Sequence, residues 1–309
     1  MSLSRKLPRT DEGRMTAQDL GIGKKNNTAP ADIVFSANTI ARLDILQPKF
    51  KLKMQARDVA LSIQAISTKT KDAAMGIARN YISDYIQTFN AGIGRGIFLK
   101  EDRPYFHLDI NSSAVPPLTT EAAVIEAGKW IIDGDPLRVA AGGAAMAMPT
   151  TAEVSAKYTI FINSVNDQST KKDAYDTAQE AVQALRPEAD ALILRMWNEV
   201  ETAFDNEAIE SRRRNAREWG VFYVSTTKSL ITGTVINKET GDVLPNVTVT
   251  LIEVDDVVTT DEGGNYRLST GYVGTGTLAF SLEAYVPQTF TVEVTDECEI
   301  NQNVKMLKV

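Results

Sequence analysis

The sequence predicts an α+β multidomain protein in which an N-terminal antiparallel α-helical bundle is followed by a C-terminal antiparallel β-sandwich. Through most of residues 33–220, apolar residues recur every three or four positions, the period of an amphipathic helix. From residue 229 to residue 309, apolar residues alternate with polar ones between segments rich in Gly, Asn and Asp, as in half-buried strands joined by turns. With 309 residues, the chain is long enough for two hydrophobic cores.

Residues 1–32 are expected to form a flexible, basic N-terminal arm. Residues 1–30 hold six Lys or Arg and three Asp or Glu, a net charge of +3, and few large apolar side chains. Such a segment buries too little apolar surface to build a core of its own. We therefore expect it to order only against a neighbouring molecule.

Helical spacing predicts an α-helical bundle domain over residues 33–220. Ser36 is a suitable N-cap for the first helix, and Pro48 should kink or divide that helix. The first apolar series consists of Ile40, Leu43, Leu46, Phe50, Met54, Val59, Leu61, Ile63 and Ile66. A second series, from Ala74 to Phe89, should end at Gly92 and Gly94.

Two further helices are expected in the middle of the chain. One begins near Thr120, and Gly134-Asp135-Pro136 should end it. The next begins near Thr151. Between them, residues 140–147 are mostly small, which suits close packing of backbones.

The longest regular pattern runs from Tyr175 to Phe204 and is nearly a heptad seam, with Pro187 in the first turn of a restarted helix. The seam fits a core helix of an antiparallel bundle or an intermolecular coiled coil. The basic cluster at Arg212, Arg213, Arg214 and Arg217 fits a helix C-terminus, so no nucleic-acid partner is expected.

Three apolar alternations predict the strands: Ile231, Gly233 and Val235; Val247, Val249 and Leu251; and Tyr266 and Leu268. The segments between them, residues 237–246 and 261–265, are rich in Asn, Asp and Gly, which tolerate positive φ or bond their own backbone. They predict turns.

This string of residues resembles the carboxypeptidase regulatory-like family. The resemblance is carried by Gly233-Thr234-Val235, Gly241, Leu244-Pro245, Val247-Thr248-Val249, Thr260-Asp261-Glu262-Gly263 and Tyr266-Arg267-Leu268. It implies an Ig-like or transthyretin-like β-sandwich over residues 229–309. Because this module accompanies many unrelated domains, the resemblance implies a fold rather than an activity. Peptidase activity is not expected, because the preceding helical region has one His.

Charge and cysteine content narrow the setting. Residues 229–309 hold four Lys or Arg and twelve Asp or Glu, a net charge of −8, so this region is acidic. Cys298 is the one cysteine, which excludes an intrachain disulfide. No signal peptide and no membrane span is predicted. We expect a protein of the cytoplasm, or of a particle assembled there.

Few residues suggest chemistry. His107 is the one histidine and is expected to be a loop residue bonded to backbone, so no catalytic residue and no cofactor is predicted. Paired acids in the predicted turns could bind Ca²⁺ through oxygen ligands if two loops met at one end of the sandwich. These Ca²⁺ candidates are Asp255, Asp256, Asp261 and Glu262.

Two classes of function remain. In the first, the protein is a non-enzymatic structural or assembly component that self-associates, or docks on a larger particle, through the helical bundle and the N-terminal arm. It then displays the acidic sandwich. In the second, the sandwich loops bind a glycan, a peptide or Ca²⁺. The partner expected in the first case is another protein, either a further copy of the chain or a component of a larger assembly.

Overall fold

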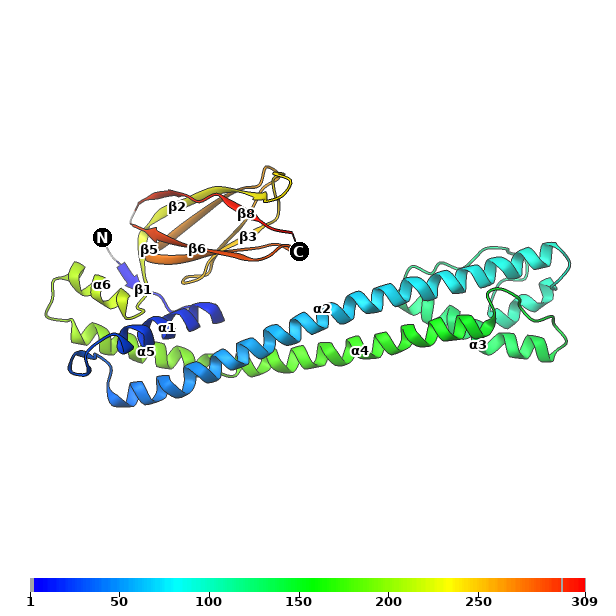
Figure 1. Cartoon of the computed structure of the whole chain (residues 1–309), viewed down its shortest axis with the longest axis horizontal. Coiled ribbons are helices and arrows are strands. Elements are labelled where there is room, and N and C mark those ends of the chain that lie inside the picture. The colour runs from blue at the N-terminus through cyan, green and yellow to red at the C-terminus, as the bar shows by residue number, and fades with distance from the viewer. Residues whose placement is uncertain (1–2, 296, 309) are drawn as a thin grey trace. The chain divides into compact units, whose positions relative to one another are not determined.

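The computed structural model describes residues 3–295 and 297–308. It has a long N-terminal helical region and a C-terminal region of strands (Figure 1). The chain divides into two compact units: Met1–Gln55 with Ala181–Val309 form unit 1, and Ala56–Glu180 form unit 2. The units therefore do not follow the predicted division into helical and strand domains, because the first and last helices share unit 1 with the strands.

The α-helices are α1 (Asp11–Asn26), α2 (Ala37–Gly94), α3 (Glu121–Ala140), α4 (Thr151–Gln183), α5 (Arg186–Ala203) and α6 (Ile209–Glu218). Two 3₁₀ helices are η1 (Pro30–Asp32) and η2 (Lys100–Phe106). The strands are β1 (Leu3–Arg5), β2 (Tyr223–Asn237), β3 (Thr248–Leu251), β4 (Asp256–Thr259), β5 (Asn265–Ser281), β6 (Gln288–Val294), β7 (Glu299–Asn301) and β8 (Val304–Met306).

The N-terminal segment differs from the flexible arm that its composition predicts. Strand β1 pairs with β2, and α1 follows it. Thr10 caps α1, since its side chain accepts a hydrogen bond from the N–H of Gly13. The buried carboxylate of Asp11 accepts two hydrogen bonds from the Arg186 guanidinium, both 2.8 Å long. A few charged contacts thus fix a segment that has little apolar surface of its own.

The core of unit 1 joins helices to strands. It contains Ala17 of α1, Phe50 of α2, Trp197 of α5 and Ile231 of β2, all of them fully buried. Pro187 lies in the first turn of α5, as expected. From Val182 to Val200 the seam buries its residues in this core, which agrees with a core helix rather than an intermolecular coiled coil.

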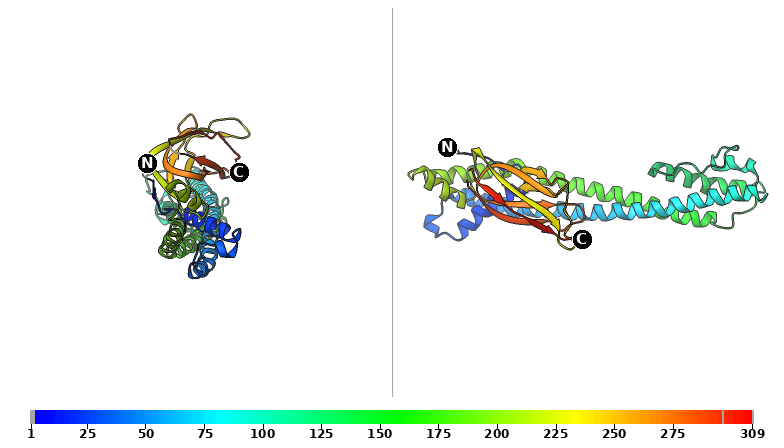
Figure 2. Two further views of the ribbon diagram at one scale, coloured as in Figure 1. Left: turned by 90° about the vertical axis from the view of Figure 1, so that its left-hand side faces the viewer. Right: turned by 90° about the horizontal axis from the view of Figure 1, so that it is seen from above.

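Unit 2 has a separate core built from its parts of α2 and α4 with α3 and η2. Within this unit α2 and α4 lie side by side in two views (Figures 1 and 2). The Ser67 hydroxyl donates to Asp167 (2.7 Å), while Tyr85 contacts Thr151, so the two helices run antiparallel. Phe106 lies against the ring of Tyr85 within the core.

Pro48, expected to kink or divide its helix, does not divide it, and Pro136, expected to end its helix, does not end it. Helix α2 continues through Pro48, and the neighbouring Leu46 and Phe50 are buried in the unit 1 core. Helix α3 continues through Pro136 to Ala140. A buried ion pair between Asp135 and Arg138, three positions apart, stabilises its last turn. A proline inside a helix costs about 3 kcal/mol, which tertiary contacts of this kind offset.

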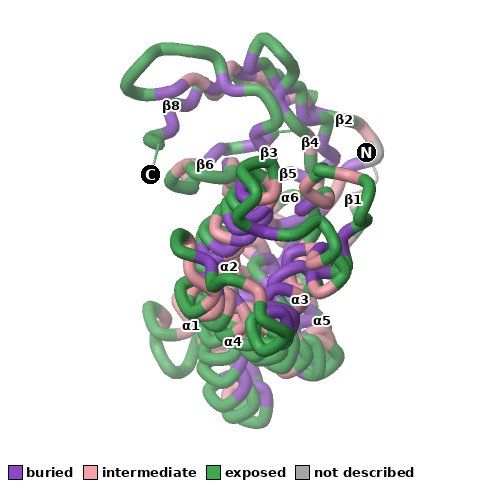
Figure 3. The backbone as a smooth tube through the Cα atoms, turned by 90° about the vertical axis from the view of Figure 1, so that its right-hand side faces the viewer, coloured by how far each residue is buried: buried purple, intermediate pink, exposed green. Residues whose placement is uncertain are grey.

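The strands are ordered β1-β2-β5-β3-β4, with β6 on β5. Most pairs are antiparallel, but β7 and β8 pair in parallel with β2, so the prediction of a wholly antiparallel arrangement is wrong there. Side chains alternate between buried and exposed along β5, as the period of two requires. Figure 3 shows the loops of the strand region exposed and segments of its strands buried.

Candidate docking surface

One face of α2 carries exposed apolar side chains in unit 2. Its residues are Val59, Ile63, Ile66 and Ile77, each between 44% and 66% exposed, and we call them the α2 face. They are spaced by three, four or seven positions or their sums, so they line one side of the helix. Ile45 and Leu52, both exposed, precede Val59 at the same seven-residue spacing along α2.

Three residues of the α2 face belong to the first apolar series of the predicted bundle. Val59, Ile63 and Ile66 continue the series that holds Leu43 and Phe50, although only the last two are buried. The signal that distinguishes the two sets is the exact recurrence of seven in Ile45, Leu52, Val59 and Ile66, which defines a second stripe on the helix.

The helix around the α2 face is strongly basic. Residues 49–71 hold six Lys or Arg and one acidic residue, Asp58, a net charge of +5. Lys53 and Lys69 are exposed. Lys71 pairs with Glu121 at 2.8 Å, so part of the charge is neutralised within unit 2. The remaining positive charge favours an acidic surface as a partner.

The four Ca²⁺ candidates are not brought together. Asp255 and Asp256 lie at the start of β4, and Asp261 and Glu262 follow its other end. At about 3.3 Å per residue, Asp256 and Asp261 are about 16 Å apart along the chain. Among the described residues, no group of three His, Cys, Asp or Glu side chains is placed to hold a metal.

Each pair of acids has a local role. Asp256 accepts a hydrogen bond from the Thr270 hydroxyl (2.7 Å) and lies 3.9 Å from the Lys6 ammonium. The Asp261 side chain accepts the N–H of Gly263 (2.9 Å) and that of Asn265 (2.8 Å), so it closes its own turn. These contacts give Asp256 a role between β4 and β5, and Asp261 a role in its own turn.

The same acids flank a sheet edge. Strand β4 is the end of the strand path, and the pairing found for it is with β3. Val257, at its centre, is 52% exposed. An edge strand with an exposed apolar side chain between acidic ends can bind another chain.

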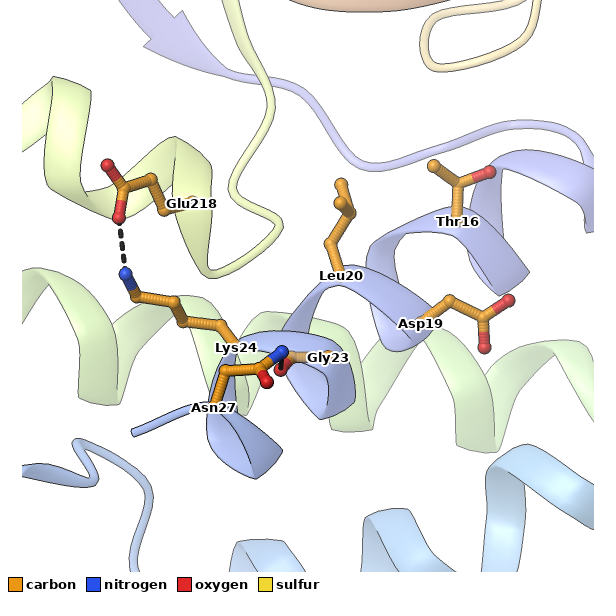
Figure 4. Close-up of a pocket in the computed structure, with 7 residues that line it drawn as sticks. All are labelled: Thr16, Asp19, Leu20, Gly23, Lys24, Asn27 and Glu218. Carbon is orange, nitrogen blue, oxygen red and sulfur yellow. Dashed lines mark hydrogen bonds and ion pairs between the residues drawn. The ribbon is translucent and has the colours of Figure 1, made fainter. Parts of the chain in front are cut away.

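A shallow groove lies beside α1 (Figure 4). The Lys24 ammonium and the Glu218 carboxylate close one side of it with an ion pair of 2.5 Å between α1 and α6. Leu20 projects into the open part, and Asn27 caps the helix by donating to the carbonyl of Gly23. This groove was not predictable from the sequence, because residues 1–32 were expected to be a flexible arm.

His107 has the structural role that was expected. It ends η2 in the left-handed conformation (φ 53°), and its N–H donates to the carbonyl of Pro104. Its ring stacks on that of Trp130 with centroids 5.1 Å apart. Stacking and backbone bonding account for the position of this residue.

The chain thus combines a helical region, which carries the exposed α2 face, with a smaller region of strands. Residues 230–307 match the carboxypeptidase regulatory-like domain family, as the resemblance predicted. No curated protein matches the chain. None of the helices in the described part of the chain has both the length and the apolar character of a membrane span.

Three solved structures share a limited similarity with the chain. A type II cohesin–X-dockerin complex from Acetivibrio cellulolyticus is 16% identical over 25% of this chain and 52% of that chain, with a TM-score of 0.22. The 3-chlorocatechol 1,2-dioxygenase from Rhodococcus opacus is 13% identical over 28% of this chain and 62% of that chain, with a TM-score of 0.22. The Bacillus anthracis TIE protein is 26% identical over 27% of this chain and 18% of that chain, with a TM-score of 0.23. The chain thus spans about half the length of the first, and none of them assigns a function.

Proposed function

We propose that the protein is a non-enzymatic structural or assembly component that self-associates, with the acidic β4 edge of a second copy bound to the α2 face of the first. The observation that supports this proposal is the exposed apolar α2 face itself. In this proposal the strand region is an Ig-like or transthyretin-like sandwich that supplies contacts rather than catalysis. The site of action is the cytoplasm or a particle assembled there.

The width of the stripe favours a protein partner. The α2 face is a narrow seam, since Ser62, Gln64 and Lys69 separate its residues along the helix. A helix that lies on a membrane presents a wide apolar face, whereas a seam of this width suits a narrow ridge or edge on another protein.

Charge favours the β4 edge as the occupant. Two α2 helices packed on each other would each bring the +5 charge of residues 49–71, so they would repel. Residues 229–309 carry −8, and four of their acids flank exposed Val257 on β4. The two surfaces are therefore complementary in both charge and apolar character.

A contact between two unlike surfaces has a consequence for stoichiometry. A pair joined by one contact keeps one free α2 face and one free β4 edge, so association continues until the assembly closes or a filament grows. The smallest closed assembly is a two-fold dimer in which the α2 face of each copy binds the β4 edge of the other, and every other arrangement is larger.

The test is the absolute mass in solution by light scattering at about 0.05 M and 1 M salt, where charges are screened within about 14 Å and about 3 Å. The expected mass is at least twice 33.8 kDa at low salt and lower at high salt. Replacing Ile63 and Ile66 by Ser removes about 1 kcal/mol of burial each, which weakens the contact about thirtyfold.

The matched control replaces Ile97 and Leu99 by Ser, since both are exposed apolar residues outside the α2 face. This control should keep the low-salt mass. A salt-independent monomer would refute self-assembly. Equal effects of the two double variants would refute the α2 face as the contact surface. A monomer that sediments with anionic lipid vesicles would replace the proposal with a membrane-surface role.

A further inference from the structure

A cavity of about 490 Å³ lies in unit 1, where α1 and α6 meet β5 and β6. Three residues, Thr16, Leu20 and Glu218, line both this cavity and the groove of Figure 4, so the two are neighbours. Its volume falls in the range of about 300–1,000 Å³ that is usual for small-molecule sites.

Arg217 supplies a cation with unused hydrogen-bonding capacity. It extends from α6 into the cavity lining, and its Nε is buried without a hydrogen-bond partner among the described residues. Gly274 makes room for it: a Cβ at Gly274 would lie 3.2 Å from the Arg217 Cδ, and the backbone there has φ of 137°. A buried donor without a partner is costly, so this position favours a ligand that accepts a hydrogen bond.

Glu253 supplies a buried carboxylate on the same cavity. Its two oxygens accept the N–H of Thr277 at 3.0 and 2.9 Å, and the residue is only 2% exposed. Burial raises the pKa of this carboxyl more than the N–H bond lowers it. A carboxylate has about four acceptor positions, so it can accept further hydrogen bonds from a ligand.

The remaining wall has an apolar part, formed by Leu20, Val221, Phe222 and the ring of Tyr272. Its other charged members are Arg214, Glu218, which pairs with Lys24, and Glu293, which accepts a hydrogen bond from the Thr275 hydroxyl. The Tyr272 hydroxyl donates to the carbonyl of Thr275 (2.7 Å), which leaves the ring as the surface available to a ligand. The cavity thus brings the Arg217 cation, the Glu253 carboxylate and an apolar surface together.

We infer that this cavity binds a small zwitterion with an apolar side chain, of the class of the apolar α-amino acids. The Arg217 guanidinium holds the ligand carboxylate, because its planar donors match a carboxylate. Glu253 accepts hydrogen bonds from the ligand ammonium, and the apolar wall holds the side chain. This site is independent of the proposed self-association, which uses residues of unit 2 and β4.

Isothermal titration calorimetry of the full chain with three probes tests the site. L-Leucine carries both charged groups, isocaproate lacks the ammonium, and isoamylamine lacks the carboxylate. The expected result is saturable binding of one L-leucine per chain, with each analogue at least about tenfold weaker, as the loss of one charged hydrogen-bonded group implies. Absence of heat from L-leucine up to about 10 mM, or equal binding of all three probes, would overturn the inference.

Two variants locate the binding. Arg217→Gln should weaken L-leucine about tenfold to hundredfold while isoamylamine is unaffected. Glu253→Gln should weaken L-leucine and leave isocaproate unaffected. Arg212→Gln, on the same helix but outside the cavity lining, is the control and should bind as the wild type does. Circular dichroism verifies that each variant is folded, and unchanged L-leucine affinity in folded Arg217→Gln contradicts the assignment.

Discussion

Replacing Arg138 by Met should lower the free energy of unfolding of unit 2 far more than that of unit 1. Arg138 is fully buried, and its Nη2 donates to Asp135 and to the carbonyl of Ala144, both at 2.7 Å. Its Cζ lies 5.2–6.0 Å from three aromatic ring centroids, contributed by Phe89, Phe98 and Phe106. The side chain therefore joins the end of α3, the loop after it and the aromatic core.

The magnitude follows from the charge that the variant leaves behind. Asp135 is only 6% exposed, so without Arg138 its carboxylate is a buried charge lacking a cation. Breaking such a pair costs about 3–5 kcal/mol, while removing both charges costs less. The double variant Arg138→Met, Asp135→Asn should recover at least about 2 kcal/mol, because the amide still accepts the hydrogen bond from Thr151.

Hydrogen exchange with mass spectrometry is the assay, because peptides of each unit are read separately and a chain of two units need not unfold in one step. Lys129→Met, which removes an exposed ion pair on the same helix, is the control and should leave exchange unchanged. A loss below about 1 kcal/mol in Arg138→Met, or a double variant no more stable than the single one, would refute the reasoning.

Two further predictions concern unit 1. Burial raises the pKa of Glu199, but hydrogen bonds led by that from the Ser36 N–H outweigh it and lower the pKa overall. The resulting stability is present above the usual Glu pKa of about 4.3 and lost as pH falls through the lower folded value, so Glu199→Gln should flatten acid unfolding followed by circular dichroism. Gly220→Ala should lower the free energy of unfolding by about 2 kcal/mol in a denaturant titration, since φ is 85° and a Cβ would lie 2.5 Å from the Ala17 carbonyl oxygen. Gly23→Ala should instead stabilise α1 by about 0.5–1 kcal/mol, because a Cβ there meets no atom within 4 Å.

Features set by local sequence were predictable. Ser36 and Thr120 cap α2 and α3 by accepting backbone N–H groups, and a cap needs only the right side chain at the start of an apolar period. The alternation along β5 has the same local origin, and it led to the family that residues 230–307 match. The N-cap at Thr10 was an equally local signal for α1, although too few apolar residues followed to support a helix prediction.

Features set by distant contacts were not predictable. Pro136 lies inside α3 because Arg138 and Asp135 are buried together, and their burial depends on the aromatic residues Phe89 of α2 and Phe106 of η2. The parallel pairing of β7 and β8 depends on where the chain returns to β2. The residues that line the cavity at Arg217 come from α1, α6 and two strands, so no single stretch of sequence predicts it.

The division of unit 1 into two separated stretches constrains the order of events during synthesis. The Arg5 side chain bonds to Asn198, 193 positions later, and β1 needs β2, which is made later still. At a synthesis rate of roughly 5–20 residues per second, β1 and α1 are made on the order of ten to forty seconds before their partners. All of unit 2 is translated within that interval, so its core can form on the ribosome first. A chaperone that shields the nascent N-terminal segment would therefore act on unit 1 and leave unit 2 unaffected.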